Sequence, residues 1–228
     1  MTWRTRLTLP MASLVVALSA GTPAHASLTE FTGLGAGSPA GITGGPGADV
    51  WFTQQGTPGG LGQMASSGTL TEFTAGLTAG ADPADVAAGP DGAVWFTEPG
   101  ATDAIGRLDP ATGTVTEYTA GLTQGSDPTA IAAGPDGNLW FTQPAKPGIG
   151  RITPAGTITE FGSGPSGGAP TDITAGPDGN LWFTTTGPDG VARLAPGTGV
   201  VTEFTEGLSP AGAPAGITAS ASGKLFFT

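Results

Sequence analysis

A four-residue motif recurs along this chain at an almost constant interval. It consists of an aliphatic residue followed by Trp-Phe-Thr or Phe-Phe-Thr, and its copies are separated by 44, 45, 42 and 44 residues. The copies occupy residues 50–53, 94–97, 139–142, 181–184 and 225–228. A fixed period of this length indicates that the fold is built from one repeated structural unit.

A second marker, Thr-Glu followed by an aromatic residue, has the same period. Its glutamates are Glu30, Glu72, Glu117, Glu160 and Glu203. Gly-Pro-Asp-Gly sequences at 89–92, 134–137 and 176–179 lie within the repeats. In these, Pro presets a turn and Asp-Gly tolerates its left-handed position. The markers therefore predict short strands joined by tight turns.

One repeat, residues 170–204, divides into four predicted strands at 170–175, 180–184, 191–194 and 200–204. Four antiparallel strands in about 44 residues are typical of a β-propeller blade, in which neighbouring blades cover both faces of each sheet. The predicted fold class is all-β, a β-propeller of repeated four-stranded blades. Four blades are complete and a fifth is partial.

The strands at the two ends of the repeat pattern do not add up to a complete blade that would close a ring. An outer strand at 28–32 precedes the four blades, and only the two inner strands of a fifth blade follow them. Because an unpaired strand edge invites association, we expect the chain to be a fragment of a longer propeller. An irregular five-bladed ring and completion by another chain are the alternatives.

The outer hairpin of each blade pairs a basic or amide residue with the recurring glutamate, if its loop has two or three residues. This register predicts that Arg107 faces Glu117, Arg151 faces Glu160 and Arg193 faces Glu203. Gln63 would face Glu72 in the first blade. Cross-strand charge pairs then give these residues a purely structural explanation.

The first 26 residues have the pattern of a secretory signal peptide. Arg4 and Arg6 precede an apolar segment at 7–20, and small residues end at Ala26. The segment is too short for a permanent membrane anchor. We therefore expect cleavage near Ala26, secretion to the periplasm or the extracellular space, and a propeller of residues 27–228.

Composition then excludes several kinds of chemistry. The chain has 18 Asp and Glu against 7 Lys and Arg, with a net charge of −11, so its surface repels nucleic acid and anionic membranes. No Cys is present, which excludes thiolate zinc sites and cysteine nucleophiles. His25, the one histidine, lies within the predicted leader.

The repeat itself resembles that of a known family. Ile-Thr-Ala-Gly-Pro-Asp-Gly-Asn-Leu-Trp-Phe-Thr (173–184) and Ile-Gly-Arg-Ile-Thr-Pro-Ala-Gly-Thr-Ile-Thr-Glu-Phe (149–161) are similar to the repeats of virginiamycin B lyases, also called streptogramin lyases. The resemblance covers essentially all of 27–228. It implies a seven-bladed ring and a magnesium-dependent elimination that opens the lactone of streptogramin B antibiotics, which are cyclic peptides.

The resemblance also implies where the functional residues belong. The family's basic His follows the Pro that opens an inner strand, and here those positions hold Ala40, Ala84, Thr129, Thr171 and Ala215. None of these residues abstracts a proton at neutral pH. The catalytic base is therefore unassigned by the sequence.

The family's magnesium ligands include a carboxylate after Trp-Phe-Thr, a slot that holds Gln54, Glu98, Gln143 and Thr185. Glu98 is accordingly the candidate Mg²⁺ ligand and a candidate catalytic residue. The alternative is a solvated loop glutamate. Asp85 and Asp172, each two residues after a Pro on a presumed inner strand, are candidate substrate-binding residues because inner strands line the channel of a propeller.

Three functions remain open. The first is a secreted lyase that uses Mg²⁺ and acts on a small cyclic peptide, with this chain truncated or inactive. The second is a non-catalytic extracellular module that binds a ligand or protein through rim loops at 77–83, 122–128 and 162–170. The third, a propeller lactonase, needs several carboxylates around one divalent cation. A complete ring would be a monomer.

Overall fold

The computed structural model describes residues 15–19, 27–31, 37–57, 59–208 and 212–228. Four sheets have four strands each, hydrogen-bonded antiparallel in chain order. The strands of blade 1 are β3 (Ser38–Gly44), β4 (Val50–Gln55), β5 (Gly60–Met64) and β6 (Leu70–Phe73). Those of blade 2 are β7 (Val86–Ala88), β8 (Val94–Glu98), β9 (Ala104–Asp109) and β10 (Thr114–Tyr118).

The next two blades repeat this order. Blade 3 contains β11 (Ile131–Ala133), β12 (Leu139–Gln143), β13 (Gly148–Ile152) and β14 (Ile158–Gly162). Blade 4 contains β15 (Ala169–Ala175), β16 (Leu181–Thr186), β17 (Gly190–Leu194) and β18 (Val201–Phe204). The described helical structure is one short 3₁₀ turn, η1 (Pro46–Ala48), and no described helix is long and apolar enough to cross a membrane.

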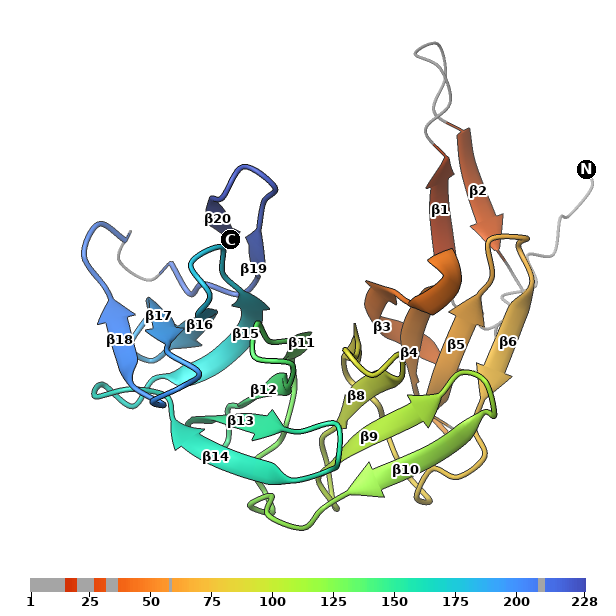
Figure 1. Ribbon diagram of the computed structural model, residues 1–228, viewed down its shortest axis with the longest axis horizontal. Coiled ribbons are helices and arrows are strands. Elements are labelled where there is room, and N and C mark those ends of the chain that lie inside the picture. Colours follow the sequence, from red (N-terminus) through yellow and green to blue (C-terminus); the bar gives the residue numbers. More distant parts are fainter. Residues whose placement is uncertain (1–14, 20–26, 32–36, 58, 209–211) are drawn as a thin grey trace, which may run out of the picture.

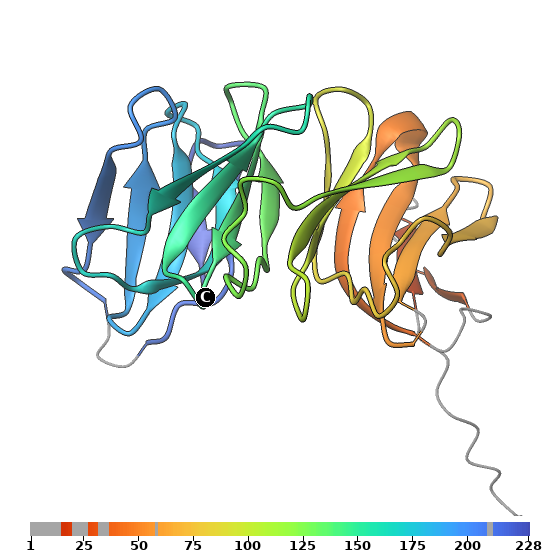
Figure 2. The ribbon, with the colours of Figure 1, turned by 90° about the horizontal axis from the view of Figure 1, so that it is seen from below.

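The blades stand side by side in an open arc (Figures 1 and 2). The first strands of successive blades, β3, β7, β11, β15 and then β19, contact one another and form the inner wall. The prediction of an all-β propeller with four complete blades is confirmed.

Two-stranded sheets lie at the ends of the arc (Figure 1). β19 (Ile217–Ala219) pairs with β20 (Leu225–Phe227), as expected for a partial fifth blade. β2 (Ser27–Phe31) falls on the predicted outer strand, and it pairs with β1 (Val15–Ser19) rather than with the fifth blade. β1 lies inside the predicted leader, whose cleavage stays a prediction.

Packing explains why the two sequence markers recur together. In blade 2, Trp95 and Phe96 point to opposite faces of the sheet, and both are fully buried. The Trp95 ring stacks on Tyr118 of the outermost strand, with centroids 5.7 Å apart. Equivalent pairs occur in the other three complete blades. The aromatic residue after each Thr-Glu therefore covers the Trp of its own blade.

The threonine of the motif joins neighbouring blades. The Thr97 hydroxyl accepts a hydrogen bond from the Asp85 amide (3.1 Å) and donates one to the carbonyl oxygen of Thr129 in the next blade (2.6 Å). Thr53 and Thr184 donate in the same way to the carbonyl oxygens of Ala84 and Ala215. This hydroxyl satisfies inner-strand backbone groups that would otherwise be buried without partners.

The predicted register of the outer hairpins was wrong by one residue. Arg107 lies opposite Thr116, and Glu117 lies opposite Gly106. The loop after Asp109 spans four residues, 110–113, instead of three, and such a slip moves every side chain to the other face. The same shift places Arg151 opposite Thr159, Arg193 opposite Thr202, and Gln63 opposite Thr71.

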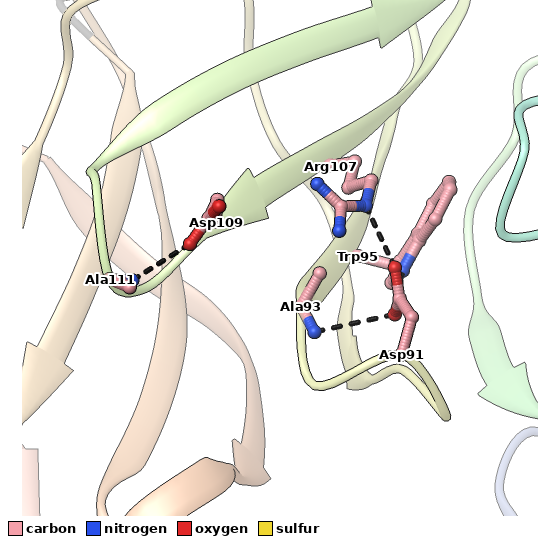
Figure 3. A network of polar contacts seen from close by, with 6 residues as sticks. All are labelled: Asp91, Ala93, Trp95, Arg107, Asp109 and Ala111. Carbon is pink, nitrogen blue, oxygen red and sulfur yellow. Dashed lines mark hydrogen bonds and ion pairs between the residues drawn. The ribbon is translucent and has the colours of Figure 1, made fainter.

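The arginine instead covers the Trp of its blade. Arg107 lies over the Trp95 ring at 5.8 Å, and its Nε is 2.8 Å from Asp91 Oδ2 in the Pro-Asp-Gly turn (Figure 3). Asp91 also accepts hydrogen bonds from the Ala93 amide and from Trp95 Nε1. The turn aspartate thus satisfies local donors, as predicted, and fixes the indole as well.

Candidate functional site

The inner wall lines a broad cavity of about 360 Å³ that is open to solvent, called here the axial cavity. Every position at which the family resemblance places the basic His lines this cavity. These residues are Ala40, Ala84, Thr129, Thr171 and Ala215. Asp85 and Asp172 line it too, so the structure brings the two candidate substrate-binding residues together.

Asp85 and Asp172 are tied to the backbone of the following blade. Asp85 Oδ2 accepts a hydrogen bond from the Ile131 amide (2.9 Å), and Asp172 Oδ2 accepts one from the Ile217 amide (2.7 Å). Burial raises the pKa of both carboxyl groups, and the nearby charge of Asp172 contributes to the raised pKa of Asp85. A carboxylate accepts several hydrogen bonds, so each keeps capacity for a donor in the cavity.

The residues at the equivalent position of the other blades are small. They are Gly41, Ala130 and Gly216. A Cβ atom on Gly41 would lie 2.5 Å from Asp85 Oδ1, so the Asp85 carboxyl occupies the space beside this glycine. Among the described residues that line the axial cavity, the acidic side chains are those of Asp85 and Asp172.

Glu98 is a buried residue at the end of β8. It is 3% exposed, so the interpretation as a solvated loop glutamate was wrong. It ends β8 and lines a separate cavity of about 50 Å³, together with residues 78–81, 99, 101 and 102. The axial cavity shares none of these residues, so the structure does not group Glu98 with Asp85 and Asp172.

Glu98 lies beside Glu117, and this pairing was missed from the sequence. In blades 1 and 3 the slot after Trp-Phe-Thr holds a glutamine. Gln54 Nε2 donates to Glu72 Oε1 (3.1 Å), and Gln143 Nε2 donates to Glu160 Oε1 (2.6 Å). Blade 2 has a carboxyl group in the place of that amide. The recurrence of Gln, Glu, Gln in one slot is the signal that could have revealed it.

The environment of Glu98 disfavours its charged form. Burial, the charge of Glu117 and a hydrogen bond with Glu117 raise the pKa of Glu98 to about 8. Its Oε1 atom is buried and has no hydrogen-bond partner. At neutral pH, Glu98 is therefore mainly protonated and shares its proton with the neighbouring carboxylate.

The glutamates of the second marker also hold the rim loops. Glu117 accepts hydrogen bonds from the amide of Thr78 (2.6 Å) and from its hydroxyl. Glu160 holds Thr123 and Glu203 holds Ser166 in the same manner. The loops at 77–83, 122–128 and 162–170 are thus fastened to the outer strand of the following blade.

The fit of a divalent cation to these residues can be judged from the donor atoms. Among the residues that the structure describes, no group of three or more His, Cys, Asp or Glu side chains could hold a metal ion. Glu98 and Glu117 nevertheless supply two carboxyl groups, one with an unpartnered buried oxygen. Mg²⁺ prefers oxygen ligands and commonly retains several waters, so the pair is chemically suited to it.

Comparisons with known proteins agree with this architecture. A catalytically inactive His-to-Ala variant of virginiamycin B lyase from Staphylococcus aureus, crystallised with quinupristin, is 34% identical with a TM-score of 0.79, over 89% of this chain and 67% of that one. A streptogramin B lyase structure is 33% identical with a TM-score of 0.80, over 89% and 66%. A gluconolactonase from Xanthomonas campestris, 19% identical with a TM-score of 0.64 over 83% and 68%, shares the fold.

Comparison with curated proteins finds no sequence match. The chain spans about two thirds of the length of both lyase structures. The model of the virginiamycin B lyase family matches residues 27–228, which include all four complete blades and the partial fifth. This chain belongs to the virginiamycin B lyase family.

Proposed function

We propose that this chain is exported and that its axial cavity binds cyclic depsipeptides of the streptogramin B class. The observation that carries the proposal is the convergence of five family base positions and two half-buried aspartates on one cavity. Asp85 and Asp172 accept hydrogen bonds from N–H groups of the ligand. The small side chains around them leave room for a bulky ring.

Opening a lactone by elimination requires a catalytic base, so the lyase activity of this chain depends on whether it has one. Ala and Thr at the five positions cannot take a proton from carbon. The S. aureus relative is catalytically inactive as a His-to-Ala variant and was crystallised with quinupristin. By analogy, we propose that residues 27–228 bind the antibiotic but turn it over slowly or not at all.

Glu98 and Glu117 are the residues that would hold Mg²⁺. Bound there, the ion would act as a Lewis acid toward an ester oxygen. Because Glu98 must lose its proton to bind a cation, Mg²⁺ affinity rises with pH up to about 8. Thermal denaturation with and without Mg²⁺ at pH 6 and pH 8.5 tests this. The stabilisation should appear at the higher pH and be lost in Glu98→Gln.

Titration of the purified chain with quinupristin, followed by calorimetry, tests the binding site. Asp172→Asn should weaken binding about tenfold, because one charge-assisted hydrogen bond is worth roughly 1.5 kcal/mol. Asp178→Asn is the matched control, since Asp178 lies in the turn of the same blade and contacts Trp182 instead of the cavity. Equal affinities of the two variants would remove Asp172 from the site.

Mass spectrometry of the incubated antibiotic separates the reactions. A linear product of unchanged mass that disappears with chelator would establish elimination by this chain, and the proposed lack of turnover would be wrong. A gain of one water would indicate an esterase or lactonase. Binding without any product is the expected result.

A non-catalytic module for another extracellular ligand is the second candidate. The fastened rim loops favour it, because recognition by loops on a rigid scaffold requires such anchoring. If quinupristin does not bind while the chain unfolds cooperatively, this second function becomes the better explanation.

A further inference from the structure

The cavity beside Glu98 contains a buried oxygen atom that no described group satisfies. Glu98 is 3% exposed, and its Oε1 atom has no hydrogen-bond partner. The residues with side-chain oxygen atoms that line this cavity of about 50 Å³ are Thr78, Glu98 and Thr102. A single water needs roughly 10–15 Å³ of such space. The cavity therefore has room for a few waters or for a partly hydrated ion.

Thr78 connects this cavity to the second carboxyl group of the pair. Its amide donates to Glu117 Oε1 (2.6 Å), and its hydroxyl donates to Glu117 Oε2. A hydroxyl has one proton and two lone pairs, so Thr78 Oγ1 keeps acceptor capacity after this donation. Donation to a carboxylate also polarises the hydroxyl and makes its oxygen more basic. Thr78 Oγ1 is therefore a strengthened oxygen donor at the wall of the cavity.

Blade 3 has the same threonine contact without a second carboxyl group. Thr123 donates its amide and its hydroxyl, each at 2.7 Å, to Glu160. Glu160 also accepts a hydrogen bond from Gln143 Nε2, in the slot that Glu98 occupies in blade 2. The hydrogen atoms of that amide carry partial positive charge and disfavour a cation. Blade 3 is thus an internal reference, in which the threonine only anchors its loop.

We infer, on the basis of the Mg²⁺ site proposed above, that Thr78 Oγ1 is a third protein ligand of the ion held by Glu98 and Glu117. Mg²⁺ requires near-octahedral oxygen coordination and usually keeps several waters, so three protein oxygens and the waters of the cavity are sufficient. Threonine hydroxyls bind Mg²⁺ in phosphate-binding loops as well. The ion then fixes the rim loop 77–83, which leads into the inner strand of blade 2 beside the axial cavity.

Mn²⁺ is the probe, because it prefers the same oxygen ligands as Mg²⁺ and its free ion is measured directly by electron paramagnetic resonance. The purified chain should bind Mn²⁺ saturably at pH 8.5, in competition with Mg²⁺. Thr78→Val removes the hydroxyl but keeps the amide contact with Glu117, and it should weaken binding by about tenfold or more. Thr78→Ser retains a hydroxyl and should bind Mn²⁺ as the wild type does.

Thr123→Val and Thr102→Val are the matched controls. The first removes the same hydroxyl contact from blade 3, and the second removes a hydroxyl from another residue that lines the cavity. Both should leave the Mn²⁺ affinity unchanged. Amide hydrogen exchange gives an independent measurement: Mg²⁺ should slow exchange in residues 77–83 and leave residues 122–128 unaffected.

Equal Mn²⁺ affinities of the wild type and Thr78→Val would overturn the role of Thr78 and leave a site of two carboxyl groups. An equal loss of affinity in Thr102→Val would also overturn it, because the effect would then belong to the whole cavity. Tighter binding by Thr78→Val would show that Thr78 competes with the ion for Glu117. If the wild type does not bind Mn²⁺, or if Glu98→Gln binds it equally well, the proposed Mg²⁺ site itself is wrong.

Discussion

Blades 2 and 3 have the same scaffold but differ in three of their polar groups. Each has four strands, a Trp packed against an outer aromatic residue, and an arginine over that Trp. Blade 2 has Glu98 where blade 3 has Gln143, and Asp85 where blade 3 has Ala130. Arg107 forms an ion pair with Asp91, whereas Arg151 Nε is buried without a partner.

The comparison separates the residues that build every blade from the residues that differ between blades. The features that the two blades share explain the repeat, since they bury the aromatic residues and join adjacent blades. Two of the three differences place an acidic group with a raised pKa next to a cavity. Perturbed carboxyl groups in cavities are candidates for function, so blade 2 is the best place in this arc to look for chemistry.

The largest expected effect comes from converting the blade 2 pair into the blade 3 pair. Native Glu98 keeps its proton up to a pKa of about 8, whereas an unfolded glutamate loses it near 4.5. The free energy of unfolding should therefore fall as pH rises between these values, by roughly 3–5 kcal/mol at 1.36 kcal/mol per pKa unit. Glu98→Gln should remove this dependence in urea denaturation at pH 5, 7 and 9.

The reverse exchange is the matched control. Gln143→Glu should introduce the same fall in stability with rising pH into blade 3, because it places a second carboxyl group beside Glu160. Identical pH profiles for wild type and Glu98→Gln would show that the Glu98–Glu117 pair does not set the stability.

The contact between Glu98 and Glu117 could not be predicted from the sequence. The blade repeat and strand order could be predicted, because the two markers and the turn residues repeat locally. Glu98 and Glu117 lie on β8 and β10, which are separated by β9, so their contact depends on the register of two hairpins. The loop between β9 and β10 is one residue longer than predicted, so the predicted register of this hairpin was wrong. For the same reason the Arg107–Asp91 contact was not predicted.

A smaller effect is expected where Asp85 is converted to the blade 3 residue. Asp85→Ala should lower the free energy of unfolding by about 1 kcal/mol. The Ile131 amide loses its acceptor, which costs roughly 1–3 kcal/mol, and removal of a partly desolvated carboxyl group offsets part of that loss. Thermal denaturation measures this loss of stability. The control variant is Asp109→Ala, which removes a hydrogen-bond acceptor from an exposed loop. A stabilised Asp85→Ala variant would mean that the desolvation cost dominates.

The smallest expected effect is the difference in the free energy of unfolding between the Arg107→Ala and Arg151→Ala variants. Arg107→Ala should cost about 0.5–1 kcal/mol more than Arg151→Ala, because both lose the contact with a Trp but only Arg107 loses a partly exposed ion pair. The excess should shrink in 1 M salt, where charges are screened within a few ångströms. An excess that is independent of salt would point to packing instead of charge.

The motif threonine has a consequence for how such proteins change size. Its hydroxyl bonds one inner strand to the next with atoms that the repeat itself provides on both sides of the joint. A whole repeat that is inserted by gene duplication would therefore bring both the threonine donor and the carbonyl acceptor of such a joint. Insertion or deletion of a whole repeat would thus preserve this type of bond between neighbouring blades.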